Sequence, residues 1–276
     1  MNLNRRARYS LNVQYFLGRA GVFILAPITF LVVKSLGYRI EDLRRVRESI
    51  RSIMDGHRGG WIICANHLTM IDSVIVAWAL MSFSRYVVDF RSLPWNLPER
   101  NNFQKNAVLA LLCYLTKCIP IHRGGDREEI RRTMEKCAHL LENGSNLLIF
   151  PEGGRSRLKT VDRQNFSYGV GRLAQKCPSA RILCIYLRGI GQERYSTIPK
   201  RGERFVVLAE EFRHDVNERG LKGQREIARR IVDKLGSMEN EWFDIVAGRK
   251  KRQAPAWIKR MVPNRLQSTG RNILET

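Results

Sequence analysis

The chain has 276 residues, of which 44% are hydrophobic and 9% aromatic, so a sizeable core can form and a largely disordered chain is excluded. Its 48 lysines and arginines outnumber 26 acidic residues, which gives a formal net charge of +22. This excess predicts an anionic partner: a nucleic acid, an anionic lipid, a phosphorylated metabolite or an acidic carrier protein. Composition alone does not choose among these four.

Residues 1–54 read as a basic, apolar, membrane-associating helical segment. The longest uncharged run, residues 20–33, is bounded by Arg19 and Lys34 and contains a proline. Because its 14 residues fall short of the roughly 20 that span a bilayer, we expect a shallow, interfacial or re-entrant segment. A buried core helix is the alternative. Arginines on both sides of the run suit the anionic cytoplasmic leaflet: Arg5, Arg6, Arg8, Arg39, Arg44, Arg45 and Arg47.

Short apolar runs alternate with helical patterns through residues 55–247. The clearest helix is expected over 126–144, with Asp126 as its N-cap and Gly144 at its C-terminus. Other helices are predicted over 39–54, 70–82, 101–116 and 222–246, and strands over 61–65, 85–90, 118–123, 146–150, 180–189 and 204–212.

This alternation predicts an α/β fold with a largely parallel, mixed sheet flanked by helices. The six cysteines form no C-x-x-C pair and mostly lie in apolar runs, so we interpret them as reduced core residues. The tail, residues 248–276, is basic with interleaved aromatic residues, as in a membrane-surface helix or a solvated tail. Sites of such folds lie beyond the carboxyl ends of parallel strands, where three polar groups follow predicted strands: Asn66-His67, His122-Arg123 and Glu152-Gly153-Gly154.

His67 and Asp72 follow the first of these strands with four residues between them. If the chain turns into a helix at Leu68, the Asp72 carboxylate returns to the face of His67. There it can fix the imidazole tautomer and stabilise the imidazolium. No nucleophilic side chain belongs to this pair, so its natural substrate is an alcohol that is deprotonated directly and attacks an activated acyl group. Alone the spacing is a weak signal, and a histidine without catalytic function is the alternative.

The stretch FPEGGRSR, residues 150–157, follows the apolar run at 146–150. Its carboxylate, two glycines and two arginines suit a turn that brings main-chain N–H groups close to an anion. An ordinary glycine turn is the alternative.

Together, NHLTMID (66–72) and FPEGGRS (150–156) resemble the N-H-x4-D and F-P-E-G motifs of the glycerolipid acyltransferase superfamily, of which the 1-acylglycerol-3-phosphate acyltransferases are the best-known members. The resemblance covers roughly residues 55–190. It implies an acyltransferase catalytic domain at 55–247 that serves lipid biosynthesis and phospholipid metabolism. The acyl donor would be acyl-CoA or acyl-carrier protein as co-substrate, with no other cofactor and no metal. The acceptor would be a lysolipid hydroxyl at the cytoplasmic face of the cell (inner) membrane, with the protein peripheral or monotopic.

The resemblance also implies a function for each motif residue. His67 would be the general base and Asp72 its orienter, with Asn66 holding the turn. Arg123, in the position of the arginine that ends the second motif, would bind a phosphate or carboxylate of the acceptor. In the third motif, Glu152 would contact an acceptor hydroxyl or a neighbouring arginine, Gly153 and Gly154 would present N–H groups, and Arg155 with Arg157 would add positive potential for the donor's phosphates.

Departures from the family pattern concern the residues that read the acceptor. Gly154 replaces the usual threonine, His122 stands where an acidic residue is common, and Leu68 and Thr69 replace a polar pair. The acceptor therefore stays open among lysophosphatidic acid, a lyso-aminolipid and a polyene or pigment precursor. A non-catalytic membrane-binding homologue is a further alternative, against which the intact His67–Asp72 pair argues. A nucleic-acid partner is disfavoured because no recognition motif is found.

Overall fold

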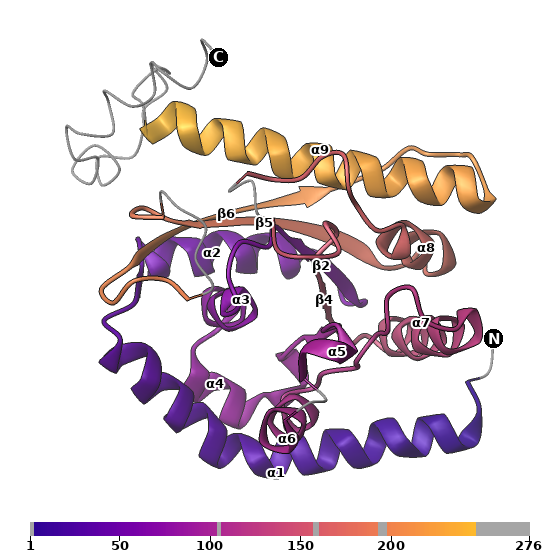
Figure 1. Cartoon of the computed structure of the whole chain (residues 1–276), viewed down its shortest axis with the longest axis horizontal. Helices are drawn as coiled ribbons and strands as arrows, with labels where there is room; N and C mark the ends of the chain where they lie inside the picture. Colours follow the sequence, from indigo (N-terminus) through magenta and orange to yellow (C-terminus); the bar gives the residue numbers. More distant parts are fainter. Residues whose placement is uncertain (1–2, 104–105, 157–159, 193–197, 247–276) are drawn as a thin grey trace.

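The structure is a computed structural model that describes residues 3–103, 106–156, 160–192 and 198–246 (Figure 1). Arg157 and the basic tail at 248–276 lie outside the described residues.

A six-stranded sheet in the order β1-β6-β5-β2-β4-β3 forms the centre of the molecule. Four neighbouring strands, β2 to β5, run parallel to one another, whereas β6 is antiparallel to β5 and parallel to β1. This confirms the predicted α/β fold with a largely parallel, mixed sheet. The strands are β1 (Arg39–Ile40), β2 (Trp61–Ala65), β3 (Trp95–Asn96), β4 (Leu147–Ile149), β5 (Arg181–Gly189) and β6 (Arg204–Phe212).

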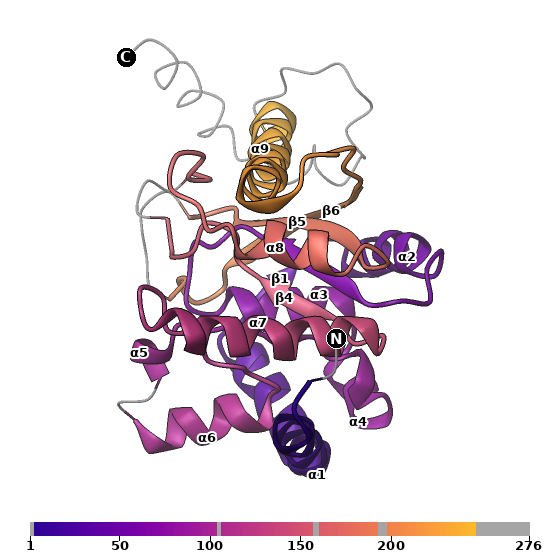
Figure 2. The ribbon, with the colours of Figure 1, turned by 90° about the vertical axis from the view of Figure 1, so that its right-hand side faces the viewer.

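Helices cover both faces of the sheet through two separate apolar clusters. One face is covered by α7, α8 and α9, and the other by α2, α3 and α4. Figures 1 and 2 show α9 at one end of the molecule and α1 at the opposite end, beside α6. The helices are α1 (Arg5–Ser35), α2 (Leu43–Met54), α3 (Asp72–Leu80), α4 (Phe83–Val88), α5 (Arg100–Phe103), α6 (Ala107–Leu115), α7 (Arg127–Glu142), α8 (Gly169–Lys176) and α9 (Gly220–Val246).

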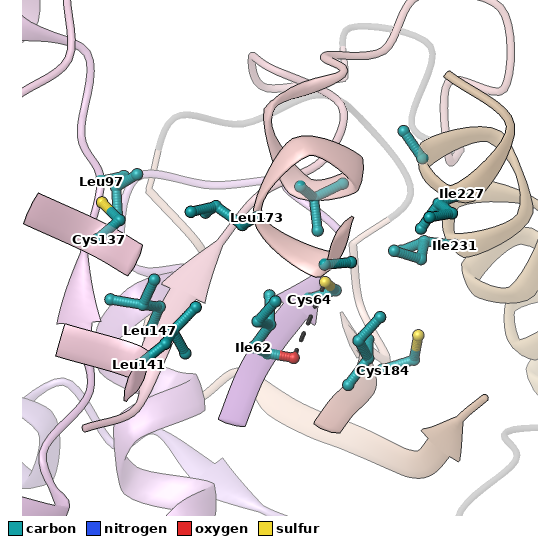
Figure 3. Packing of buried hydrophobic residues seen from close by; sticks show 14 of the residues in the cluster. Ile62, Cys64, Leu97, Cys137, Leu141, Leu147, Leu173, Cys184, Ile227 and Ile231 are labelled. Atoms are coloured by element: carbon teal, nitrogen blue, oxygen red, sulfur yellow. Dashed lines mark hydrogen bonds between the residues drawn. The ribbon is translucent and has the colours of Figure 1, made fainter. Parts of the chain in front are cut away.

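The central strand β2 is buried on both faces, which is why it is apolar at every position. Ile62 and Cys64 belong to the cluster under α7, α8 and α9, and the other three side chains of β2 belong to the opposite cluster. Figure 3 shows Ile62 and Cys64 among the side chains that cover the first face, including Leu173 of α8 and Ile231 of α9. All six cysteines are free thiols, and five of them are buried as expected.

The strand predicted at 85–90 is wrong, because this stretch lies in helix α4 and in the short 3-10 helix η1 (Phe90–Ser92). The Ser82 hydroxyl caps α4 by accepting a hydrogen bond from the Arg85 N–H (3.2 Å). Phe83, Tyr86 and Phe90 are buried at helical spacing. The run reads as a strand only when it is taken without its flanking residues.

The strand predicted at 118–123 is also wrong, since only two isolated bridges form there, to Asn96 and Glu99. Pro120 has no N–H to donate to a ladder, which prevents a continuous strand. The sheet instead ends at the short strand β3, which we did not predict.

Two helix predictions need correction at their boundaries. The helix expected at 101–116 is two helices, because Asn106 caps α6 by accepting hydrogen bonds from two N–H groups of its first turn. The helix expected at 39–54 begins at Leu43, after β1. Helix α8 was missed altogether, whereas α3, α7 and α9 confirm the predicted helices at 70–82, 126–144 and 222–246.

The N-terminal segment is longer than its uncharged run suggests. Helix α1 has 31 residues and contains Pro27 together with Arg19 and Lys34, the two cations that appeared to bound the run. The Arg19 guanidinium lies over the Phe23 ring, 5.0 Å from its centroid, so the helix accommodates this charge without ending. By length and composition alone α1 could cross a membrane, and the length argument against a span is therefore wrong.

Candidate active site

The two motif segments meet at one edge of the sheet because β2 and β4 are parallel neighbours. Cys64 of β2 pairs with Ile149 of β4, so the strands end almost level. His67 follows the end of β2, and Phe150 follows the end of β4. The structure thus places the candidate base beside the FPEGG turn, where the predicted parallel sheet requires it to be.

Asp72, the first residue of α3, is the side chain with the most hydrogen-bond partners at this edge. Its fully buried Oδ2 accepts hydrogen bonds from the N–H groups of Leu68 (2.6 Å) and Thr69 (2.7 Å) and contacts His67 Nδ1 at 2.9 Å. The Thr69 hydroxyl donates to Oδ1. These donors fix the position and orientation of the carboxylate. Asp72 therefore serves as an acceptor that keeps the proton on Nδ1 and leaves Nε2 of His67 as the basic nitrogen.

The third motif holds His67 from three sides. The Glu152 Oε1 accepts a hydrogen bond from the His67 N–H at 2.8 Å, and the Ser156 N–H donates to the His67 carbonyl at 2.8 Å. The imidazole stacks on the Phe150 ring with centroids 4.2 Å apart. Only a fifth of the His67 side chain is exposed. The turn therefore fixes the main chain and the ring plane of the base, in addition to anything it binds.

Glu152 uses both carboxylate oxygens on main-chain groups, because its Oε2 accepts a hydrogen bond from the Asp162 N–H at 3.0 Å. Burial raises the pKa of Glu152 to about 8, although these two N–H donors act in the opposite direction. The carboxyl group thus connects the His67 turn to the loop at 160–165. The expected contact between Glu152 and an acceptor hydroxyl stays a prediction.

Asn66 also acts on the main chain. Its side chain is fully buried, donating to the Leu187 carbonyl (3.0 Å) and accepting from the Leu187 N–H (2.7 Å). This pair of hydrogen bonds continues the β2–β5 ladder past the end of β2. Asn66 is placed to hold the turn before His67, and its buried side chain offers no exposed atom to a substrate.

Arg123 reaches the FPEGG turn from another part of the chain. Its guanidinium lies beside Gly153, with Nη1 3.8 Å from the point where a Cβ on that glycine would stand. Glu99 holds it in place, accepting a hydrogen bond from the Arg123 N–H (3.2 Å) and facing its Nε at 3.6 Å. Burial of the guanidinium lowers the pKa of Arg123 from its ordinary value, and Glu99 partly offsets this. The structure therefore brings together a cation and a glycine turn, as an anion site requires.

The glycines of the turn differ in what they need. Gly153 has a φ of +72°, in the left-handed region that favours glycine. Gly154 is exposed, and a Cβ on it would meet no atom within 4 Å. Arg155, which follows, is half-buried and has polar partners of its own. A threonine could therefore stand at Gly154, and its absence leaves open space beside the turn.

Sequence reasoning missed the contributions of Thr69, Phe150 and Ser156. For Thr69 a signal existed, because T-x-x-D before a helix resembles a capping box, in which side chains and main-chain N–H groups form hydrogen bonds with each other. Main-chain contacts such as that of Ser156 leave no residue-type signal. Within the described residues no group of three or more histidine, cysteine or acidic side chains could hold a metal ion.

One edge of the parallel sheet thus brings together a buried carboxylate, an imidazole and a glycine turn with a cation beside it. The family model described as Acyltransferase matches residues 38–188, more than half of the chain, and contains all of these residues. The chain belongs to this acyltransferase family.

Two other comparisons add little. A search of the curated proteins found no match. Among solved structures, the 1-acyl-sn-glycerophosphate (LPA) acyltransferase PlsC from Thermotoga maritima is similar over 84% of this chain and 97% of its own, with 14% identity and a TM-score of 0.43. A likeness of this degree supports no conclusion about the site.

Proposed function

We propose that this protein transfers a fatty acyl group from a thioester donor to a hydroxyl of a lysolipid at a membrane surface, with His67 as general base. The observation that carries the proposal is the contact between His67 Nδ1 and the buried, multiply hydrogen-bonded Asp72 carboxylate. Such a pair has one use in acyl transfer when no nucleophilic side chain accompanies it, namely deprotonation of the acceptor.

In the proposed reaction the acceptor O–H gives its proton to Nε2 of His67 as its oxygen attacks the thioester carbonyl. Asp72 stabilises the imidazolium that forms. When the tetrahedral intermediate collapses, the C–S bond breaks, and His67 returns the proton to the departing thiolate. The products are an ester and a free thiol, and the enzyme carries no acyl group at any stage. Phe150, stacked on the imidazole, keeps the ring plane constant through both proton transfers.

Arg123 supports an acceptor with an anionic head. Its planar guanidinium stands beside Gly153 and matches the geometry of a phosphate or carboxylate. The open space at Gly154 would admit a head group larger than one that fits beside a threonine. Lysophosphatidic acid and a lyso-aminolipid both fit these requirements, and they differ in how strongly they depend on the cation.

The donor is acyl-CoA or acyl-carrier protein, and no further cofactor takes part in the proposed reaction. Both donors are anionic, and the net charge of +22 would raise their rate of encounter with the enzyme. The rate of encounter would rise most for an acidic carrier protein, because the positive field of the enzyme attracts its whole surface.

The location we propose is a membrane surface, with α1 lying along it. One stripe of α1 is buried against the domain over nearly its full length: Leu11, Gln14, Gly18, Val22, Ala26 and Val33. The Gln14 amide donates to the carbonyls of Tyr114 (3.0 Å) and Cys118 (2.8 Å). At Gly18 a Cβ would stand 2.5 Å from the Leu115 carbonyl oxygen, so only glycine allows this approach. Because α1 packs against the catalytic domain along its length, it cannot at the same time span a bilayer.

Helix α6 lies beside α1 (Figure 2), and we call the exposed apolar side chains of these two helices the α1–α6 face. Helix α6 is apolar almost throughout, yet none of its residues is buried. Residues 3–40 carry six cations and no acidic side chain, which suits an anionic lipid surface. The face consists of Phe16, Leu17, Phe23, Ile24, Ile28 and Leu31 of α1 and Val108, Leu109, Leu111 and Leu112 of α6.

The chemistry is tested by incubating purified protein with labelled acyl-CoA or acyl-carrier protein and vesicles that contain a phosphate-bearing, a carboxylate-bearing or a neutral hydroxyl lipid. We expect the wild type to form an ester that mass spectrometry identifies. His67→Ala should lower its rate by about 10²–10⁴-fold, whereas the control His139→Ala on α7 should match the wild type. Full activity of His67→Ala would refute the general-base proposal.

The acceptor is tested with Arg123→Ala on the same panel. If Arg123 binds the anionic head, the variant should lose far more rate with the phosphate-bearing acceptor than with the neutral one. An equal loss with all three lipids would assign Arg123 to holding the turn. Vesicle binding without transfer from any donor would favour a non-catalytic membrane-binding protein.

A further inference from the structure

A buried polar cluster lies behind the candidate active site and takes no part in the proposed chemistry. It consists of Tyr186 and Arg188 of β5 and Glu239 and Trp242 of α9, which we call the Glu239 cluster. All four side chains are at least nine-tenths buried. Charged groups in such surroundings are costly unless they are paired, so the arrangement calls for a reason.

Within the cluster Glu239 uses one of its two oxygens. Its Oε1 accepts a hydrogen bond from the Tyr186 hydroxyl at 3.1 Å and faces the Arg188 Nη1 at 3.6 Å. The Arg188 guanidinium in turn lies over the rings of Trp242 and Phe243, at 5.3 and 4.7 Å from their centroids. These contacts hold the Glu239 carboxylate of α9 against β5.

The other oxygen of Glu239 leads to the active site. Its Oε2 accepts a hydrogen bond from the Val161 N–H at 3.0 Å. The next N–H along the chain, that of Asp162, donates to Glu152, which accepts from the His67 N–H with its other oxygen. Two buried carboxylates thus hold adjacent N–H groups of one loop, and one of them continues to the base.

The loop itself is stiffened where these hydrogen bonds meet. The Asp162 carboxylate accepts hydrogen bonds from the N–H groups of Gln164 (3.0 Å) and Asn165 (2.9 Å). A corner closed in this way transmits a displacement instead of absorbing it. These hydrogen bonds form a continuous path from Glu239 to the main chain of His67.

We propose that Glu239 is a positioning residue for the transfer reaction, acting through Val161, Asp162 and Glu152 on the main chain of His67. Glu239 lies on helix α9, which follows the segment that the family model matches. A base must sit within a fraction of an ångström of its productive position, and a small displacement lowers the rate of the chemical step without weakening substrate binding. This inference rests on the proposed function, in which His67 is the base.

The test compares three variants of the full chain at a temperature where all are folded. Glu239→Ala removes the acceptor for the Val161 N–H, whereas Glu239→Gln keeps one. Leu235→Ala, one turn earlier on α9 and fully buried, removes apolar packing and leaves the hydrogen bonds intact. We expect kcat of Glu239→Ala to fall about tenfold or more with KM changed less than about twofold. Glu239→Gln should recover most of that loss, and Leu235→Ala should lower the melting temperature with kcat unchanged.

A second readout does not depend on activity. Hydrogen exchange followed by mass spectrometry should show the segments at 66–72 and 160–165 exchanging about tenfold faster in Glu239→Ala but not in Leu235→Ala. If the wild type transferred no acyl group, the proposed function would fail. Hydrogen exchange would still test whether Glu239 restrains the main chain of His67. Unchanged exchange in Glu239→Ala, or a loss of kcat equal to that of Leu235→Ala, would overturn the inference.

Discussion

The edge around His67 and the α1–α6 face differ in how far contacts within the protein satisfy their side chains. At the edge, Asp72 and Glu152 each accept hydrogen bonds from two or more donors, and His67 is held through its ring, its N–H and its carbonyl. On the α1–α6 face, a series of large apolar side chains is exposed to solvent. The first region is complete as it stands, which suits a catalyst. The exposed side chains of the second can be buried only by an apolar partner from outside the chain, and a membrane is such a partner.

Breaking the completed edge should have the largest effect. In Asp72→Asn the side chain keeps its shape but presents an NH₂ group to N–H donors, so it can no longer hold the His67 proton on Nδ1. We expect kcat to fall about 10²–10⁴-fold with little change in KM. Steady-state kinetics measures both parameters, and circular dichroism checks the fold. Wild-type kcat in this variant would show that the pair is structural.

A second prediction concerns Lys117, a buried cation beside helix α1. Its ammonium is buried and donates to the carbonyls of Phe90 (2.8 Å), Arg91 (3.2 Å) and Leu93 (2.8 Å), and the ring of Tyr15 on α1 lies 5.2 Å away. Burial lowers the pKa of Lys117 to about 7.

Lys117→Met should lower the free energy of unfolding by about 2–4 kcal/mol, because three buried carbonyls lose their donor. Chemical denaturation measures this value. The control Lys200→Met, at an exposed position, should change it by less than about 0.5 kcal/mol. A loss as small as that of the control would show that the carbonyls find other partners.

The pH dependence of stability should report on Glu152. Burial raises its pKa to about 8, so between the ordinary value of 4.5 and 8 the folded protein binds more protons than the unfolded chain. Stability should therefore fall as pH rises through this window, by up to about 1.4 kcal/mol per pH unit. Burial also raises the pKa of Glu239, with the same sign. Denaturation of the wild type and Glu152→Gln across the window should give a flatter curve for the variant; identical curves would contradict this assignment.

The smallest effect is expected on the α1–α6 face, where no catalytic contact is altered. Val108→Glu with Leu111→Glu puts two charges on exposed positions of α6. Binding to vesicles with anionic lipid should weaken about 10–100-fold, since charge replaces apolar surface that enters the lipid. Thermal stability should be unchanged, and transfer to a detergent-dispersed acceptor should be retained.

The control Leu221→Glu lies at an exposed position on α9, far from this face. It should bind vesicles like the wild type. Equal vesicle binding by the control and the α6 variant would contradict the prediction. If the α6 variant stayed membrane-bound while its oligomeric state changed, the face would be a contact between copies of the chain.

The sequence predicted the parts of the fold that burial dictates. Strands β2, β4 and β5 lie in the sheet centre, and their continuous apolar runs mark them. The errors fell at the margins, at β3 and at α4, where a short apolar run fits a strand or a helix equally well and its neighbours decide.

The site was predictable where residue type carries the chemistry and unpredictable where the main chain does. The spacing of His67 and Asp72, taken together with the FPEGGRS stretch, predicted their contact. The clamp on the His67 main chain was not predictable, because an N–H or a carbonyl belongs to every residue. Glu239 lies far from His67 in the chain, and nothing in its local sequence marks it.

The central claim is that the acceptor hydroxyl attacks the donor directly once His67 takes its proton. The most direct test incubates the protein with the acyl donor alone, measures its intact mass, and then adds the acceptor lipid. The account predicts an unchanged protein mass, an intact donor, and ester formation only after the acceptor arrives. A protein that gains the mass of one acyl chain and then passes that chain to the lipid would contradict it.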